Sequence, residues 1–139
     1  MKAVRGKQVP RIQLRYRQLP TRCAIVRMAS DASIPEWATK GDFTSITRTA
    51  DELCIVCPGG NLPPEVKSQS HWVCLELAGP YPVSATGIII AFIEPLSENG
   101  IPVFVISAYD RDYVLIQEEI VAAATALLAS AGHQLILDK

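Results

Sequence analysis

The chain has 139 residues, of which 49% are hydrophobic and 19% are charged, so it can bury a core and is not of the intrinsically disordered class. The length fits one compact domain or two very small ones packed as a unit. The formal net charge of -1 gives no general attraction to nucleic acid or to a membrane surface, although residues 1–30 carry eight Lys and Arg residues and no acid.

The beginning of the chain lacks the apolar segment of a secretory signal, and the Ser-rich character of a transit peptide is also missing. The longest apolar run, residues 87–93, is too short to span a bilayer. We therefore expect a cytoplasmic protein. Its four cysteines lie in apolar surroundings without the spacing of a disulfide framework, which indicates reduced, buried thiols.

The first half reads as short strands. Residues 1–11 form a basic tail, and residues 12–17 and 22–28 each alternate apolar and polar side chains, as half-buried strands do. Pro35 limits residues 31–38 to a short helical turn. Residues 43–48 and 52–57 predict a hairpin that turns at residues 49–51. The Pro- and Gly-rich residues 58–64 are a loop, and we place the boundary between two halves at residue 65.

The second half, residues 66–139, predicts the order βαββαβ. Residues 71–78 alternate, with Val73, Leu75 and Leu77 on one face. Ser84 is a candidate helix N-cap, Pro95 predicts a kink or an early end, and Gly100 stops this helix. Residues 102–107 and 112–117 are strands. A second helix follows Glu118 and Glu119 and ends at Gly132, and residues 134–137 can add a last strand.

The two halves match each other. Residues 46–56 lie over residues 106–116 at a constant offset of 60, while the first strands of the halves match at an offset of 49. The difference corresponds to about 11 residues, the length of the first helix, which the first half reduces to a turn. We interpret residues 12–65 as a truncated repeat and residues 66–139 as a complete one, packed together because a half-sheet cannot bury its own face. Chance similarity between two hairpins is the alternative.

Three segments resemble ACT domains, in the tandem branch related to the CASTOR-type arginine sensors. They are residues 101–116, residues 43–58, and Gly79-Pro80 followed by Thr86-Gly87-Ile88. The resemblance covers roughly residues 12–137. It implies an α+β, ferredoxin-like fold, side-by-side pairing of domains, and a small-molecule ligand at the seam, an amino acid in well-known members. With two repeats only, this chain would need a homodimer to complete such a pocket.

The resemblance places the ligand at the start of the first complete helix and at the turn after the next strand. The residues concerned are Ala85, Thr86, Gly87, Ile88, Ala108, Tyr109, Asp110 and Asp112. A helix start offers free N–H groups to a carboxylate. Gly87 permits close approach, Asp110 or Asp112 can accept bonds from an ammonium or guanidinium, and Tyr109 can cover an aliphatic stem. Alternatively, Asp110 caps the turn, Gly87 allows tight packing, and Tyr109 fills an interface.

Other sites are disfavoured. Cys54 and Cys57 lie three apart in a strand, so their sulfurs point to opposite faces and cannot share a metal ion. No nucleophile elbow, phosphate loop or dinucleotide fingerprint is present, and we expect neither catalysis nor a cofactor. His133 follows Gly132, where a cation suits the helix end. The basic start, with Tyr16, is an RNA-binding alternative, but the aromatic signature of such sheets is absent. The sequence thus predicts an amino-acid-binding regulatory domain, with a ligand-free protein-interaction module as the main alternative.

Overall fold

The computed structural model describes residues 12–68, 71–81 and 86–137. Its elements follow in the order β1 (Arg15–Met28), η1 (Glu36–Thr39), β2 (Ser45–Arg48), β3 (Leu53–Pro58), η2 (Gly59–Asn61), β4 (Trp72–Leu77), α1 (Ile88–Ser97), β5 (Phe104–Ser107), β6 (Asp112–Gln117), η3 (Glu118–Ile120), α2 (Val121–Ser130) and β7 (Gln134–Leu135). The predicted βαββαβ order of the second half is therefore confirmed. No helix in the described part of the chain is long and apolar enough to cross a membrane.

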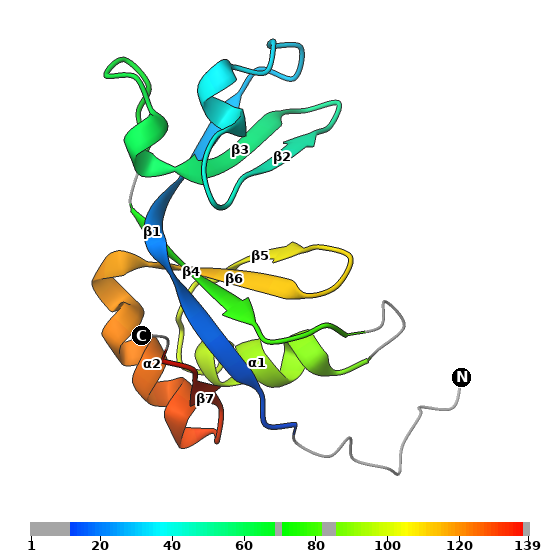
Figure 1. Ribbon diagram of the computed structural model, residues 1–139, viewed down its shortest axis with the longest axis vertical. Helices are drawn as coiled ribbons and strands as arrows, with labels where there is room; N and C mark the ends of the chain where they lie inside the picture. Colours follow the sequence, from blue (N-terminus) through cyan, green and yellow to red (C-terminus); the bar gives the residue numbers. More distant parts are fainter. Residues whose placement is uncertain (1–11, 69–70, 82–85, 138–139) are drawn as a thin grey trace.

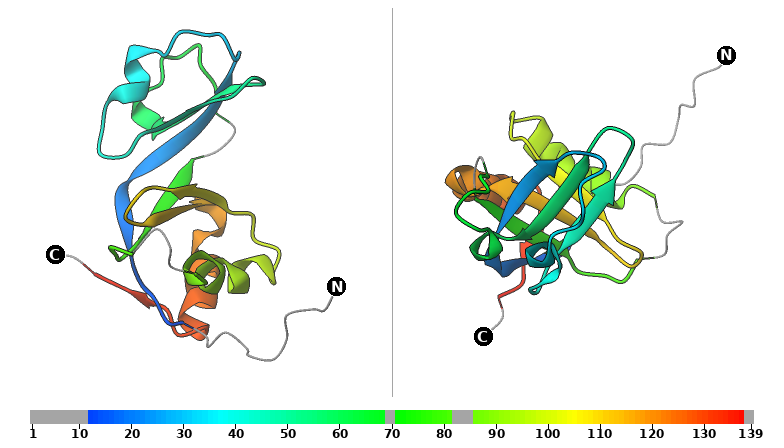
Figure 2. Two further views of the ribbon diagram at one scale, coloured as in Figure 1. Left: turned by 90° about the vertical axis from the view of Figure 1, so that its right-hand side faces the viewer. Right: turned by 90° about the horizontal axis from the view of Figure 1, so that it is seen from above.

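The described strands form one seven-stranded sheet, in which β2-β3-β1-β4-β6-β5 is the order and β7 also pairs with β1. Every pairing is antiparallel except the parallel β1–β7 pair. Figure 1 shows α1 and α2 against one face of the lower half of this sheet, and η1 and η2 in the upper half. Strand β1 runs through both halves, as Figure 2 shows, and its beginning separates β4 from β7.

Residues 12–17 and 22–28 were expected as two strands, and this expectation is wrong. They belong to one strand, β1, whose pairing with β4 shifts register between Gln18 and Arg22. Pro20 lies inside this irregularity, where a residue without an N–H is tolerated because the ladder is already interrupted. A proline that suggests a break between strands in the sequence is here accommodated within a single bent strand.

The helix-facing side of the sheet carries two apolar clusters. In the lower half, Val73, Leu75 and Leu77 of β4 are fully or almost fully buried with Phe92 and Leu128 of the helices, as predicted from the alternation. In the upper half, a smaller cluster includes Leu53, Ile55 and Cys57 of β3. The opposite side of the sheet is also buried near its centre, in a cluster of Cys23, Val56, Cys74 and Leu115.

The two hairpins superpose at a different offset from the one expected. Hairpin β2–β3 closes at the pair Arg48–Leu53 and hairpin β5–β6 closes at Ser107–Asp112, and both differences, 107 − 48 and 112 − 53, are 59. The predicted offset of 60 is wrong by one residue. Because successive side chains point to opposite faces of a strand, a shift of one residue in the offset assigns every side chain to the opposite face. The offset of 59 places Ile55 over Val114, both on the helix-facing side.

The end of the second helix also differs from expectation. Gly132 ends it at φ +93°, as predicted, but His133 is not a cation at the helix terminus. Its ring is buried, its Nδ1 accepts a hydrogen bond of 3.0 Å from the N–H of Leu14, and its Nε2 lies 2.9 Å from the carbonyl oxygen of Ala91. An accepting Nδ1 and a donating Nε2 define the neutral imidazole. His133 therefore joins three elements by hydrogen bonds.

Candidate functional site

The turn between β5 and β6 is tied to the loop that follows β4. Within the turn, the N–H of Ala108 donates to the carbonyl of Arg111 at 3.0 Å. The N–H of Tyr81 donates to the carbonyl of Asp110 at 2.7 Å. Gly79 lies so close that a Cβ on it would be 3.1 Å from the same carbonyl oxygen. The chain that leads toward α1 therefore lies against the predicted ligand-binding turn.

Helix α1 begins at Ile88, later than the predicted start at Ser84. Gly87 is its N-cap in the left-handed conformation, at φ 78°, and no side chain caps the helix. The first helical hydrogen bond joins the N–H of Ala91 to the carbonyl of Gly87 at 3.0 Å, so the three preceding amides have no partner within the helix. This left-handed conformation favours glycine at position 87. Neither of the two interpretations of Gly87 drawn from the sequence, close approach of a ligand and tight packing, included this reason.

The predicted ligand-binding residues are mostly on the surface. Tyr109 is 83% exposed, and Thr86, Ala108 and Asp110 are exposed too, whereas Asp112 is half-buried at the start of β6. Gly87 and Ile88 are half-buried, and Ile88 packs against the lower core. Ala85 and Ser84 lie outside the described residues. The structure brings the turn to residues 79–81, but within residues 86–137 no hydrogen bond joins Gly87 or Ile88 to it.

The sequence reasoning missed a cleft between the two hairpins, on the side of the sheet that faces away from α1 and α2. In the view of Figure 1 both hairpins point to the right of β1, although in the strand order β2–β3 lies beside one edge of β1 and β6–β5 lies beyond β4 at the other. A cavity of about 430 Å3 lies between them. It is lined by Ser45, Thr47, Thr49, Glu52, Cys54, Val56 and residues 104–107. We call this space the hairpin cleft. The alternation of Ser45, Thr47 and Thr49 was the sequence signal for a polar wall.

Two further cavities continue the hairpin cleft. One, of about 550 Å3, shares Ser45, Ile106 and Ser107 with it and adds Asp42 and Glu76, among other residues. It also contains Ala108, a residue of the predicted site. The other, of about 410 Å3, shares Glu52, Cys54 and Phe104 with it and adds Arg27 and Lys67. The cleft is thus acidic toward one end and basic toward the other.

The surroundings of the cysteine thiols are those of structural residues. Cys54 borders the hairpin cleft while Cys57 is buried on the helix-facing side, so the two sulfurs of the C-x-x-C lie on opposite faces, as the strand geometry predicts. Burial, followed by the negative charge of Asp42, raises the pKa of Cys23 to about 11. A protonated thiol is a poor nucleophile and a poor metal ligand. Within the described part of the chain, no three His, Cys, Asp or Glu side chains are grouped as a metal site.

Two family models match separate parts of the chain. The ACT domain family model matches residues 67–130, and a second model, described only as an N-terminal domain, matches residues 22–65. No curated protein matches the sequence.

Among solved structures, protein Atu0741 from Agobacterium tumefaciens is 39% identical, with a TM-score of 0.85 over 92% of this chain and 96% of that one. A Vibrio cholerae protein of unknown function, VC0802, described as a possible transport protein, has a TM-score of 0.68 at 18% identity, over 81% of this chain and 85% of that one.

Aspartate kinases share the fold at lower identity. The aspartokinase alpha and beta subunit structure has a TM-score of 0.57 at 18% identity, over 86% of this chain and 98% of that one. The aspartate kinase of Clostridium acetobutylicum, described as an allosteric enzyme, also has a TM-score of 0.57, at 11% identity, over 90% of this chain and 36% of that one. The predicted α+β, ACT-like fold is confirmed. The chain belongs to the same family as Agobacterium tumefaciens Atu0741, and its residues 67–130 form the part that matches the ACT domain.

Proposed function

We propose that this protein is a non-catalytic regulatory module that binds an amino acid at the start of α1 and the β5–β6 turn. The hydrogen bond from Tyr81 to the Asp110 carbonyl carries the proposal, because it holds the turn against the chain that leads to the uncapped helix start. The ACT domain match spans both places. We place the protein in the cytoplasm and divide it into residues 12–65 and 66–139, a division supported by family matches that meet between residues 65 and 67.

The chemistry of these residues suits a zwitterion. The free N–H groups at the start of α1 and the positive end of the helix dipole would bind the ligand carboxylate. The carboxylate of Asp112, half-buried at the end of the turn, would accept hydrogen bonds from the ammonium, and such charge-assisted bonds are the stronger ones. Asp110 is the alternative partner, and Tyr109 would lie over the aliphatic part of the ligand.

A second copy of the chain would complete the site. Tyr109 is 83% exposed, so in a single chain it gives a ligand little shelter from water. Small-molecule sites bury most of the ligand surface, and a homodimer that pairs ACT domains side by side would supply the missing wall. A regulated partner protein would then read the ligand-bound dimer.

The RNA-binding alternative has little surface available to it. Tyr16 is 1% exposed and packs edge-on against Phe92 at 5.1 Å, so it cannot stack on a base. Arg22 pairs with Glu118 at 2.6 Å. The sheet face without helices, on which bases stack in ferredoxin-like RNA-binding domains, is closed at its centre by the buried Cys74 and Leu115.

The test is a thermal-shift screen of the twenty amino acids, followed by calorimetry and light scattering. A ligand at 100 times its Kd stabilises the folded state by about 2.7 kcal/mol. We expect Asp112→Asn to weaken binding at least tenfold and Asp51→Asn to leave it unchanged, because Asp51 occupies in the first hairpin turn the place of Asp110 in the second. If no amino acid binds to the dimer or the monomer, the proposal fails and the interaction module without ligand replaces it.

A further inference from the structure

The two edge strands of the sheet border the same cleft. In the strand order, β2 and β5 are the two ends of the path. Residues Ser45 and Thr47 of β2 reach the hairpin cleft at alternate positions, so one face of β2 forms a wall. By contrast, the four residues Phe104–Ser107 of β5 all border the cleft. One face of a strand presents only alternate residues, so a cleft that borders four consecutive residues lies along the edge of the strand. The unpaired main-chain groups of β5 therefore face the cleft.

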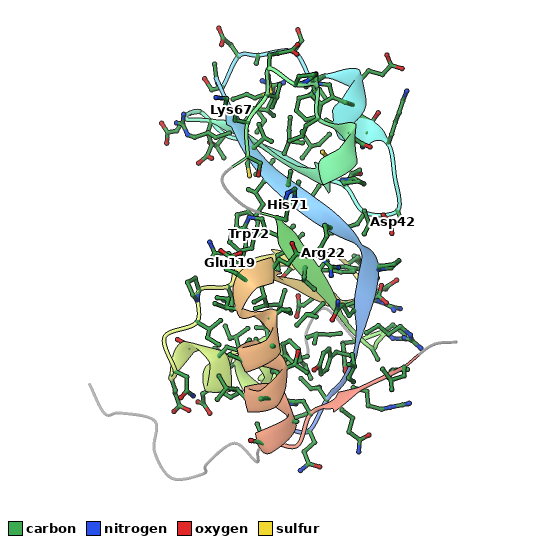
Figure 3. The ribbon with its side chains drawn as sticks, turned by 90° about the vertical axis from the view of Figure 1, so that its left-hand side faces the viewer. Arg22, Asp42, Lys67, His71, Trp72 and Glu119 are labelled. Carbon is green, nitrogen blue, oxygen red and sulfur yellow. The ribbon has the colours of Figure 1, made fainter. Side chains whose placement is uncertain are left out.

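The charges along the cleft have opposite signs at its two ends. Asp42 and Glu76 border the cavity beside Ser107, and Lys67 borders the cavity beside Phe104. Figure 3 shows Lys67 and Asp42 on opposite sides of the molecule, with Trp72 below Lys67 on the same side of the view. The separation means that a ligand of one charge would satisfy one end only, while a ligand with charged groups at both ends fits the whole cleft.

Asp42 and Lys67 make no ion pair with any described residue, whereas Glu76 is hydrogen-bonded to the hydroxyl of Tyr113. Asp42 accepts a hydrogen bond from the hydroxyl of Thr21 at 3.0 Å, which is a neutral donor. Glu76 lies beside the Tyr113 hydroxyl, where it helps raise the pKa of that tyrosine after burial, and its cross-strand neighbour is Arg17. Lys67 is exposed and makes no ion pair with the described residues. The guanidinium of Arg27 already lies 4.0 Å from the carboxylate of Glu52. We therefore take Lys67 as the cation that a ligand would meet at the basic end.

We propose that the hairpin cleft binds a short peptide with free ends, extended along the open edge of β5. Main-chain hydrogen bonds to β5 would supply affinity, as in other complexes in which a peptide adds a strand to a sheet. The peptide ammonium lies at Asp42, and its carboxylate lies at Lys67. Since Ser107 is at the acidic end and Phe104 at the basic end, the peptide runs antiparallel to β5.

The dimensions set the length and the side chains. Four residues of strand span about 13 Å, which matches a tripeptide or a tetrapeptide. The cavity of about 430 Å3 is within the range of small-molecule sites. Val56, Phe104 and Ile106 provide apolar surface and Ser45 and Thr47 provide hydroxyls, so small apolar side chains fit. This site lies within one chain and shares only Ala108, at its acidic end, with the amino-acid site proposed above.

The experiment is calorimetric titration of the full chain with Ala-Val-Ala-Val, together with its N-acetylated and C-amidated forms. We expect binding of the free peptide, and weakening by about five- to tenfold on blocking either end, because each block removes a charge-assisted contact. Lys67→Gln should weaken the free peptide but not the C-amidated one, and Asp42→Asn should weaken the free peptide but not the N-acetylated one. Amide signals of residues 104–107 should shift in heteronuclear NMR spectra.

Two exposed side chains away from the cleft serve as controls. Arg15→Gln and Glu94→Gln change charge by the same amounts and should leave peptide affinity unchanged. Circular dichroism melts establish that each variant is folded. The proposal is overturned if Ala-Val-Ala-Val does not bind, if blocked and free peptides bind equally, or if the NMR shifts avoid β5. A positive amino-acid screen together with such a result would leave the function proposed above intact.

Discussion

Replacement of His133 by alanine should destabilise the fold well beyond the loss of a surface residue. The ring is 5% exposed and bonds to two main-chain groups, the N–H of Leu14 and the carbonyl of Ala91. A buried polar group without a partner costs about 1–3 kcal/mol, so two such groups cost about 2–6 kcal/mol. A water molecule entering the vacated space would recover part of this, and we expect a loss of about 3 kcal/mol.

The assay is urea denaturation followed by circular dichroism, with His71→Ala as the matched control because His71 is exposed. For a chain of this length, the expected loss lowers Tm by roughly 10 °C. Amide hydrogen exchange adds a local measurement, since the N–H of Leu14 should lose protection ahead of the β3–β1 ladder. Equal unfolding free energies for the two histidine variants would refute the assignment of His133 as a buried, neutral link between elements.

Three other predictions concern packing, pH and surface charge. In Gly41→Ala, the added Cβ would clash with Cγ of Pro58 at a φ of +117°, so the unfolding free energy should fall by about 2–3 kcal/mol in urea titrations. Burial raises the pKa of the Cys23 thiol from 9.0 to about 11, so the unfolding free energy should be steady below pH 9 and fall between pH 9 and 11, less so in Cys23→Ala. Arg22→Ala should cost less than about 1 kcal/mol, because Arg22 and its partner Glu118 are 39% and 44% exposed, and a loss above ~2 kcal/mol would contradict this estimate.

The strands that the sequence predicted well are those whose alternation reports a single buried face. Val73, Leu75 and Leu77 lie toward the helices as their spacing requires. The intervening Cys74 is also fully buried, however, on the other side of the sheet. Its burial comes from contacts with residues distant in the sequence, among them Leu115. Local alternation carries no information about such a second layer.

The candidate site was predictable in part. The turn at residues 108–111 follows from local patterns, but α1 begins at Ile88 and not at the predicted Ser84, after Gly87 in a left-handed conformation that the sequence pattern did not indicate. The hairpin cleft could not be predicted from the sequence, for a different reason. Ser45 and Ser107 belong to the two end strands of the sheet order, β2 and β5, and only the folded sheet brings them to one cavity.

Strand β1 connects the two hairpins of that cleft, one through β3 and the other through β4 and β6. Its residues Cys23–Met28 pair with β3, while Tyr16–Gln18 and Arg22–Cys23 pair with β4, with the register shift between Gln18 and Arg22. A slip of one residue in either stretch would expose Tyr16 or the apolar face of the upper half, so the register on both sides is fixed. The irregularity around Pro20 interrupts the β1–β4 ladder between these stretches, and the beginning of the same strand pairs with β4 and β7 in the ACT-like half.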